Sequence, residues 1–463
     1  TFNELNKRFT KITPNKKTHQ WLGQVENDWQ ELIPLISKDC KNAKERKNVE
    51  NDVVKLDDKI NGANAIFKLY SLGVATNRDK WVYDLNEANL EKKVNAFVNY
   101  YHEEMERQTP EIDRLNSRNK ADKIEETTGV DLEFREFEYA LSMKIKWTRL
   151  LKKHIMRKTK FPKFNKKFVR DSMYRPFVKK KIYFFKEFNE EQYQLPKLFP
   201  TKKTKNVVIT LMGNHNNNHG QCLVANKVMD LGFHPGSVFA IPLHTYLDGE
   251  TPTQNLTAFG KEIFEEKHGQ VTDEEVFYYC YAVLNCGQYK EKYKENLKVD
   301  LPRIPLLENF RELSTLGREL AQTHLNYEEA EKFPLELYEI PQKIKHDAET
   351  LEALKRFERL NIKLQVKKDE GQVIFDDKHI LKGIPKEAFE YKIGSKSPIE
   401  WVCSDNCFSP YKYDMKEENE IFLSQMDDYN WQEVKEHLLD LIPRLVTVSI
   451  KTNEIFRKID ELF

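Results

Sequence analysis

Between Lys144 and Lys181 the chain holds sixteen lysine or arginine residues and a single acid, Asp171, although its formal net charge is only +1. The chemistry open to such a cluster is the neutralisation of phosphate, which dominates the affinity of many proteins for nucleic acids. Aromatic residues are interleaved with the cations, so the segment is not a low-complexity basic tail. It therefore predicts a nucleic-acid-binding surface, and the interleaved residues are Trp147, Phe161, Phe164, Phe168, Tyr174 and Phe177.

Acidic residues just before this stretch allow a second interpretation. A run of cations is often a solvated face whose charge is balanced by nearby acids. In that case the chain would be a protein-interaction scaffold that binds no nucleic acid. The acids concerned are Glu125, Glu126, Asp131, Glu133 and Glu136.

Helical spacing sorts the basic stretch into two faces. At about 100° per residue, five cations fall on one stripe and four apolar residues on another. One face can then pack on a core while the other meets phosphate, until Pro162 ends the helical pattern. Arg175, Lys179 and Lys180 extend the predicted DNA-contacting set further along the chain. The cationic stripe is Lys146, Arg149, Lys153, Arg157 and Lys160, and the apolar stripe is Trp147, Leu150, Leu151 and Ile155.

The loop from Ser71 to Lys80 also carries groups suited to contact with a phosphate or a base. Its glycine permits close backbone approach, and an arginine can bond bidentately to either partner. Thr76, Asn77 and Arg78 are therefore candidate DNA contacts. A turn with an ion pair at the surface, between the arginine and the acid that follows it, explains the same residues without a ligand.

The side chains of His215, His219 and Cys222 could bind zinc, but no complementary ligand pair lies at a suitable spacing. The histidines stand in a polar, loop-like Gly/Asn run, so we predict no metal site. Buried structural thiols are the better interpretation of two closely spaced cysteine pairs. These pairs are Cys280 with Cys286, and Cys403 with Cys407.

No catalytic motif stands in the chain. The patterns GxxxxGK(S/T), GxGxxG and GxSxG are absent, and so is the Asn-Pro-Pro-aromatic tetrapeptide of amino-methylating enzymes. We therefore predict that this chain alone binds no cofactor and neither methylates nor cuts DNA. No apolar run approaches the ~20 residues of a membrane span. Six cysteines spread over a chain of 463 residues indicate reduced thiols and a cytoplasmic protein.

Length and periodicity predict an α+β fold of mixed helices and short sheets in two or three packed subdomains. The expected subdomains are a helical segment 1–60, a core 61–335 and a C-terminal α+β or helical part 336–463. The predicted helices are 17–46, 86–107, several between 255 and 327 broken near Gly269 and 301–305, and 431–463 interrupted at Pro443. The predicted strands are 65–70, 81–83, 182–185, 206–211, 237–243, 362–366 and 372–375.

The chain carries, in this order, the phrases Ile66–Tyr83, Ile145–Trp147, Tyr174–Phe177, Tyr193–Pro196, Asp273–Tyr279, Leu301–Pro305, Leu325–Tyr327 and Gly383–Pro385. Each phrase is short, but their order makes the set specific. Together they resemble the C-terminal specificity region of type ISP restriction-modification enzymes, which are large single-chain bacterial proteins. The resemblance runs from about Thr18 to the C-terminus. The resemblance departs at His244, where the family tends to have tyrosine. The bases that this chain recognises can therefore not be inferred from the family.

The resemblance implies a division of labour within a longer polypeptide. An upstream nuclease and helicase would cut and translocate DNA with ATP and Mg²⁺, and a methyltransferase would mark adenine N6 with S-adenosylmethionine. This chain would be the region that reads the sequence, with residues 1–60 as the expected tail of the methyltransferase domain. The start at Thr1, without methionine, fits a fragment of such a protein.

We therefore expect sequence-specific binding to double-stranded DNA. Cations of residues 144–181 would set the register on phosphates, and loops within 71–80 and 206–255 would read base edges. The Thr76–Asp79 turn is expected beside the methyltransferase cleft, where it would steady the DNA around a flipped adenine. The alternative is an RNA-binding or RNA-processing accessory protein, which would stack unpaired bases on the aromatic residues.

Overall fold

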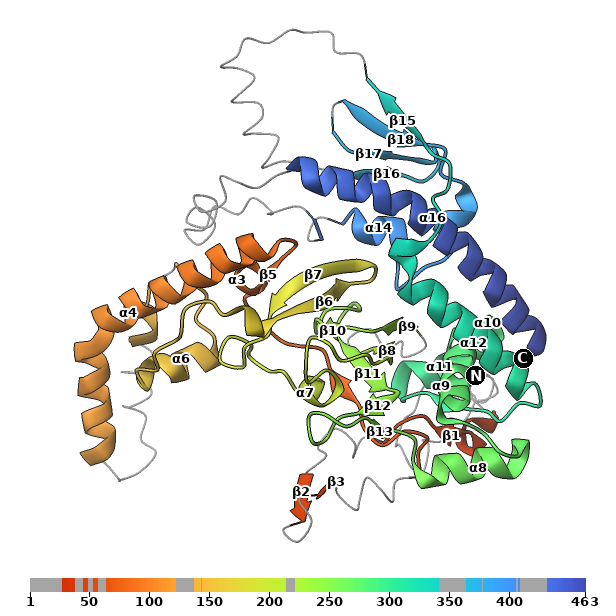
Figure 1. The fold of residues 1–463 in the computed structure, drawn as a ribbon, viewed down its shortest axis with the longest axis horizontal. Coiled ribbons are helices and arrows are strands. Elements are labelled where there is room, and N and C mark those ends of the chain that lie inside the picture. The colour runs from red at the N-terminus through yellow and green to blue at the C-terminus, as the bar shows by residue number, and fades with distance from the viewer. Residues whose placement is uncertain are drawn as a thin grey trace, which may run out of the picture.

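Helices and several small sheets make up the computed structural model, an α+β fold as the sequence predicts. A helical arm of α4 (Glu87–Ala121) and α6 (Arg149–Met156) lies on one side, two sheets lie in the middle, and a helical layer lies on the other side (Figure 1). A third sheet and the long helix α16 (Trp431–Leu462) lie above this layer in the same view. The structure describes residues 27–37, 45–48, 53–56, 64–121, 137–142, 144–213, 221–340, 364–376, 378–404, 407–408 and 431–463.

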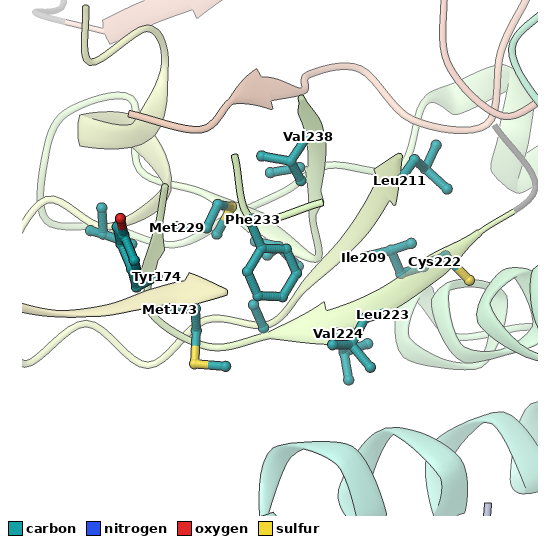
Figure 2. Close-up of a cluster of buried hydrophobic side chains, with 14 of the residues drawn as sticks. Met173, Tyr174, Ile209, Leu211, Cys222, Leu223, Val224, Met229, Phe233 and Val238 are labelled. Carbon is teal, nitrogen blue, oxygen red and sulfur yellow. The ribbon is translucent and has the colours of Figure 1, made fainter. Parts of the chain in front are cut away.

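The innermost sheet has the strand order β4-β11-β8-β9 and is antiparallel throughout. Every residue of β8 and β9 is buried, which explains why these strands are short runs of mainly aliphatic residues without alternation. Figure 2 shows their side chains packed with Phe233 and with Met173 and Tyr174 of the neighbouring sheet. The strands are β4 (Ser71–Leu72), β8 (Val208–Met212), β9 (Cys222–Ala225) and β11 (Val238–Pro242).

The second sheet, with strand order β10-β6-β7-β5, carries part of the basic stretch. Strands β6 and β7 form a hairpin, and Phe177 at its turn has a left-handed backbone with φ of 59°. The register shifts between Met173 and Arg175. Strand β10 runs parallel to β6, and the others are antiparallel. The strands are β5 (Tyr83–Asp84), β6 (Val169–Arg175), β7 (Val178–Tyr183) and β10 (Val228–Met229).

The helical arm begins after the short helix α3 (Asp79–Val82). Helix α4 (Glu87–Ala121) has 35 residues and begins close to the predicted position, but it continues past Arg107. Its buried residues include Val94, Phe97, Val98 and Tyr101, at the spacing of one helical face. Helix α6 (Arg149–Met156) contacts α4 and buries Leu151 and Ile155.

The helical layer fills residues 258–325, as the sequence predicts. A capping box of Thr272 and Glu275 begins α9, whose side chains are almost all buried. Helices α9 and α12 approach so closely that a Cβ on Gly317 would lie 2.0 Å from the Tyr278 carbonyl oxygen. Only glycine fits at that crossing. The helices are α8 (Ala258–His268), α9 (Asp273–Asn285), α10 (Gly287–Lys292), α11 (Lys294–Val299) and α12 (Phe310–Leu325).

The C-terminal part joins a small sheet to a long helix. The sheet has the strand order β15-β18-β17-β16. Strands β16 and β17 match the predicted strands near 362–366 and 372–375. Helix α16 packs on α12 and on α14. The elements are β15 (Glu336–Glu339), β16 (Gln365–Lys367), β17 (Gln372–Ile374), β18 (His379–Lys382), α14 (Pro398–Val402) and α16 (Trp431–Leu462).

Short elements complete the fold. Strand β1 (Ile33–Pro34) pairs with β14 (Arg303–Ile304), so residues near the start of the described chain pack on the core. Among the residues that the structure describes, two hairpins and five short helices form the remaining elements. They are β2 (Glu45–Asn48) with β3 (Val53–Leu56), β12 (His244–Thr245) with β13 (Thr253–Gln254), η1 (Asp28–Glu31), η3 (Lys166–Phe168), α7 (Leu195–Leu198), η5 (Tyr327–Glu329) and η6 (Lys386–Phe389).

The predicted helix 17–46 is wrong where the structure describes it. Asn27 caps a single 3-10 turn, after which Pro34 lies in a strand and the Leu35 amide donates to the Pro302 carbonyl. The apolar residues Trp29 and Leu35 are buried, but from an irregular and extended segment rather than from a helical face. Tertiary packing therefore overrides the local periodicity here.

The predicted strand 81–83 is also only partly correct, because Trp81 lies in α3 and only Tyr83 enters a strand. The segment 65–70 forms isolated bridges at Phe67 rather than a regular strand.

The predicted break at Pro443 does not occur, since α16 continues through it. A proline normally disrupts a helix, but Ile442 and Leu445 on either side are buried, and the Pro443 carbonyl accepts from the Phe333 amide. Within the described residues, no helix combines the length and the apolar character needed to cross a bilayer.

Candidate nucleic-acid interface

The basic stretch divides into cations that are paired and cations that are not. Most of the paired ones bond acids of the surrounding scaffold: Lys152 to Glu138 at 2.7 Å, and Lys158 to Asp113 at 2.5 Å. The five predicted stripe residues are all exposed, and none of them forms an ion pair with a residue that the structure describes. They are Lys146, Arg149, Lys153, Arg157 and Lys160.

Helix α6 presents three of these five cations, because it is shorter than the pattern predicts. Lys158 adopts a left-handed backbone with φ of 50° and ends the helix before Pro162. Arg149 and Lys153 therefore lie on the helix, Arg157 is its C-cap, and the other two stripe residues flank it. Burial of Leu151 and Ile155 on the opposite face keeps the cations outward.

The interleaved aromatic residues belong mainly to the core. Phe161 and Phe177 are buried, and Phe161 packs 4.3 Å from Tyr101 between ring centroids. The half-buried Trp147 donates from Nε1 to the Ser142 carbonyl. The remaining three, Phe164, Phe168 and Tyr174, also pack against the core. These rings are therefore not free to stack on unpaired bases, as an RNA-binding surface of this kind would require.

The Thr76–Asp79 turn presents only one of its three predicted contacts to solvent. Asn77 is exposed and has a left-handed backbone with φ of 55°, a conformation that asparagine tolerates well. Thr76 is buried and donates to Asp79. Arg78 is buried, with 4% of its surface exposed, and its guanidinium bonds other parts of the protein. Direct DNA contact from Thr76 and Arg78 is not supported by this arrangement.

The three predicted contacts on the β6–β7 hairpin are engaged within the protein. Arg175 donates to Asp230 at 2.7 Å, and Lys179 donates to Glu328 at 2.6 Å. Lys180 is half-buried above the Tyr174 ring, 4.2 Å from its centroid, and burial lowers the pKa of this lysine to about 8. These residues hold the hairpin in place more directly than they offer charge to a ligand.

Beneath the turn lies a buried group of residues that we call the acid–arginine cluster: Asp79, Tyr83, Tyr174, Arg175 and Asp230. The hydroxyls of Tyr174 and Tyr83 donate to Asp79 at 3.0 Å and to Asp230 at 3.1 Å. Burial raises the pKa of Asp230 to about 7, the Asp79 charge adds to this rise, and the bonded Arg175 opposes it. No pattern in the sequence points to Asp230, which lies more than 140 residues from the turn.

The loops expected to read bases are described only in part. Asn206 is buried, and its side-chain amide donates to the carbonyls of Leu198 and His244. It therefore stabilises the segment that leads into β8 and is not accessible to a DNA base. The turn and strand β13 at 248–254 are largely exposed and offer polar side chains such as Asp248. Residues 214–220 lie outside the described residues.

The zinc hypothesis falls partly outside the described chain, since it needs His215 and His219. Cys222 is buried, accepts from the Asn285 amide, and has its pKa raised to about 12 by burial. Cys280, Cys286, Cys403 and Cys407 are buried free thiols, as predicted. Across the described residues, no group of three or more His, Cys, Asp or Glu side chains is placed to hold a metal ion.

Comparison with known proteins agrees with this fold and identifies the family of the chain. Residues 65–440 match the family described as the type ISP C-terminal specificity domain, and the chain belongs to that family. No curated protein matches the chain. The resemblance stated from the ordered sequence phrases is thereby confirmed.

Three solved structures are similar to the chain. A DrdV–DNA complex solved by cryo-electron microscopy is 32% identical, with a TM-score of 0.77 over 97% of this chain. A nuclease-deletion mutant of the type ISP enzyme LlaGI, with a DNA substrate mimic, is 26% identical with a TM-score of 0.68 over 97% of this chain. The type ISP enzyme LlaBIII bound to DNA shares the fold, at 22% identity and a TM-score of 0.71 over 100% of this chain. The chain spans 40%, 36% and 26% of those three chains, respectively.

Proposed function

We propose that this chain recognises a specific sequence in double-stranded DNA as the specificity region of a restriction-modification enzyme. The observation that carries the proposal is the set of exposed cations on and around α6, unpaired within the described residues, in a member of the type ISP specificity family. Similar chains were solved in complexes with DNA, which supports the same partner here.

In this proposal, phosphate contact and base reading belong to different elements. Lys146, Arg149, Lys153, Arg157 and Lys160 would contact phosphates and fix the register of the protein on the duplex. The exposed Asn77 and the 248–254 segment would approach base edges, since amide and carboxylate groups can bond them selectively.

Upstream domains of a longer polypeptide would carry out the chemistry. They would comprise a nuclease, a helicase that uses ATP and Mg²⁺, and an adenine-N6 methyltransferase that uses S-adenosylmethionine. The buried free thiols among the described cysteines support a reducing, cytoplasmic setting.

A salt titration tests DNA binding. If six to ten phosphates are bound, the affinity for a labelled duplex should fall by about 10³–10⁵ between 50 and 200 mM salt. Fluorescence anisotropy with the purified chain measures this. Absence of binding at 50 mM salt by the folded protein would refute the proposal. Competition with single-stranded DNA and structured RNA separates it from the RNA-binding alternative.

A matched pair of double variants locates the residues that bind phosphate. Lys153→Ala/Arg157→Ala should flatten the salt slope by about one unit for each phosphate that is no longer neutralised. It should also lower the affinity for all duplexes by a similar factor, whatever their sequence. Lys294→Ala/Lys298→Ala removes the same charge from α11, which lies on the opposite side of the molecule in Figure 1, and should leave the slope unchanged. Equal slopes in both variants would exclude α6 as the phosphate-binding surface.

Selection from a pool of randomised duplexes tests specificity. The chain should enrich one sequence motif, and substitution within 248–254 should then relax discrimination at individual positions by about 1–3 kcal/mol for each bidentate base pairing removed. A pool that stays random after several rounds, despite tight binding, would reduce the proposed function to non-specific DNA binding.

A further inference from the structure

Arg78 joins three segments that are far apart in the sequence. Its Nη1 donates to the Phe188 carbonyl at 2.5 Å, its Nη2 donates to the Thr148 hydroxyl, and Nη2 lies 3.9 Å from a carboxylate oxygen of Glu190. The guanidinium also lies over the Phe97 ring of α4, 5.7 Å from its centroid. One side chain thus connects the Thr76–Asp79 turn, the residue before α6, and the loop at 188–190.

The start of α6 is arranged around this contact. Thr148 is the N-cap residue, a position where a threonine side chain usually accepts an amide of the first turn. In the described structure it forms no such bond, and its hydroxyl accepts from Arg78 instead. Glu190 takes over the capping role, because its Oε1 accepts the Leu150 amide at 3.2 Å. The first turn of α6 is therefore held by Arg78 and Glu190 rather than by its own cap.

The residue type fits this role. A guanidinium can address several acceptors at fixed angles, whereas a lysine presents a single point charge. Burial lowers the pKa of Arg78 to about 10, so the side chain stays charged at neutral pH, and Glu190 partly offsets the lowering. A purely apolar packing role would not need a buried charge.

The far end of α6 is held by a different element. The Asn116 side chain of α4 donates to the Met156 carbonyl at 2.9 Å, and Lys158 pairs with Asp113 of the same helix. Release at the Arg78 end would therefore let α6 pivot about its C-terminal attachment. The cations most displaced by such a movement would be those at the start of the helix, including Arg149.

We propose that Arg78 is a positioning residue for DNA binding, which fixes the first turn of α6 relative to the central sheets and keeps the phosphate-binding cations in register with the base-reading loops. The inference rests on the proposed function, and it replaces direct DNA contact by Arg78. This role also explains why Arg78 is buried, although the sequence predicts the Thr76–Asp79 turn at the surface.

The salt slope of duplex binding tests this role in the folded protein. Arg78→Lys and, more mildly, Thr148→Val should each flatten the slope by about 0.9 for each phosphate that is released, with an affinity loss of about tenfold per phosphate at 0.1 M salt. The double variant should bind no more weakly than Arg78→Lys, because both changes break the same link. A general loss of stability lowers the active fraction but leaves the slope of the folded molecules unchanged.

Hydrogen exchange of the DNA-free protein gives an independent measurement. Amides of the α6 segment that follows Leu150 should exchange faster in Arg78→Lys and Thr148→Val, while amides of α16 keep their parent rates. Lys435→Met is the matched control, since Lys435 is another buried cation, bonded to Asp376 at 3.0 Å in the C-terminal part. It should leave both the α6 exchange and the salt slope unchanged.

The outcomes separate the two proposals. A parent protein that binds no duplex at 50 mM salt would overturn the proposed function and, with it, the role of Arg78 in binding. A parent that binds, with variants that keep both its salt slope and its α6 exchange rates, would overturn only the role of Arg78.

Discussion

Helix α6 and the acid–arginine cluster both contain arginine but use it in opposite ways. On α6, Arg149 and Lys153 are exposed and have no ion-pair partner among the described residues. In the cluster, Arg175 and Asp230 are largely buried and bond each other at 2.7 Å. A charge left in water remains available to a ligand, whereas a buried charge depends on its partner for solvation.

The local density of charge therefore does not identify a binding surface. Residue type alone predicts a DNA contact at Arg175 of the cluster as readily as at Arg149 of α6. The cluster pairs its largely buried charges within the protein, whereas α6 leaves its cations exposed. Substitutions should therefore affect folding in the cluster and DNA binding on α6.

The largest effect is expected when the buried pair is broken. Arg175→Met leaves Asp230 buried without its cationic partner and should lower the free energy of unfolding by about 3–5 kcal/mol. Arg311→Met, which breaks an exposed pair with Glu275, should cost no more than about 1 kcal/mol. Urea denaturation monitored by circular dichroism measures both. Similar losses in the two variants would remove the contrast between buried and exposed pairs.

A smaller loss is expected at Gly73, where the cluster packs against the turn-bearing loop. A Cβ at this position would lie 2.4 Å from the Asp230 carbonyl oxygen, and backbone must move to make room. Gly73→Ala should therefore lower the unfolding free energy by about 1–3 kcal/mol. Thermal unfolding checks this, and an unchanged melting temperature would show that the two segments can separate without cost.

The pH dependence of stability should reveal Asp230. Its pKa of about 7 lies above the unfolded value of about 3.9. Such a carboxyl contributes stability that is fully present below the unfolded pKa and is lost as the pH rises through the folded pKa. The unfolding free energy of the parent relative to Asp230→Asn should therefore fall between about pH 4 and pH 7, by at least about 1.4 kcal/mol. A difference that is flat over this range would show that Asp230 stays ionised.

The smallest effect on stability is expected on α6. Lys153→Ala/Arg157→Ala removes two exposed cations without touching Leu151 or Ile155, so the unfolding free energy should stay within about 0.5 kcal/mol of the parent. The same denaturation experiment applies. A decrease above about 2 kcal/mol would mean that these cations hold structure, and a weaker DNA affinity could then not be attributed to phosphate binding.

The sequence predicts elements that local signals define better than elements that depend on distant partners. The face of α4 and the helices between 258 and 325 follow from apolar spacing and from caps such as Thr272, which are local signals. The predicted helix 17–46 fails because the partners of its described part are distant, as in the pairing of Ile33 with Ile304. No local pattern contains that information.

The candidate interface was likewise predictable only where local spacing determines it. On α6 itself, the exposed Arg149 and Lys153 and the buried Leu151 and Ile155 lie where helical spacing puts them. The ends of the stripe, Lys146 and Lys160, fall outside the helix, which is shorter than predicted. The burial of Arg78 does not follow, because its acceptors are at positions 148 and 188–190. The Arg175–Asp230 pair likewise depends on the parallel pairing of β6 with β10, which sequence separation hides.

Helix α16 has a consequence for the order in which the protein folds. Its 32 residues extend about 48 Å and bond many partners earlier in the chain. Thr452 bonds His324, Asn453 bonds the Glu387 carbonyl, and Asp460 accepts the Gly287 amide. The helical layer therefore lacks part of its covering until α16 has been synthesised. Until then, the apolar faces of α9 and α12 that α16 covers would be exposed to solvent on the nascent chain. When α16 is shortened, we therefore expect aggregation during synthesis rather than weak equilibrium stability.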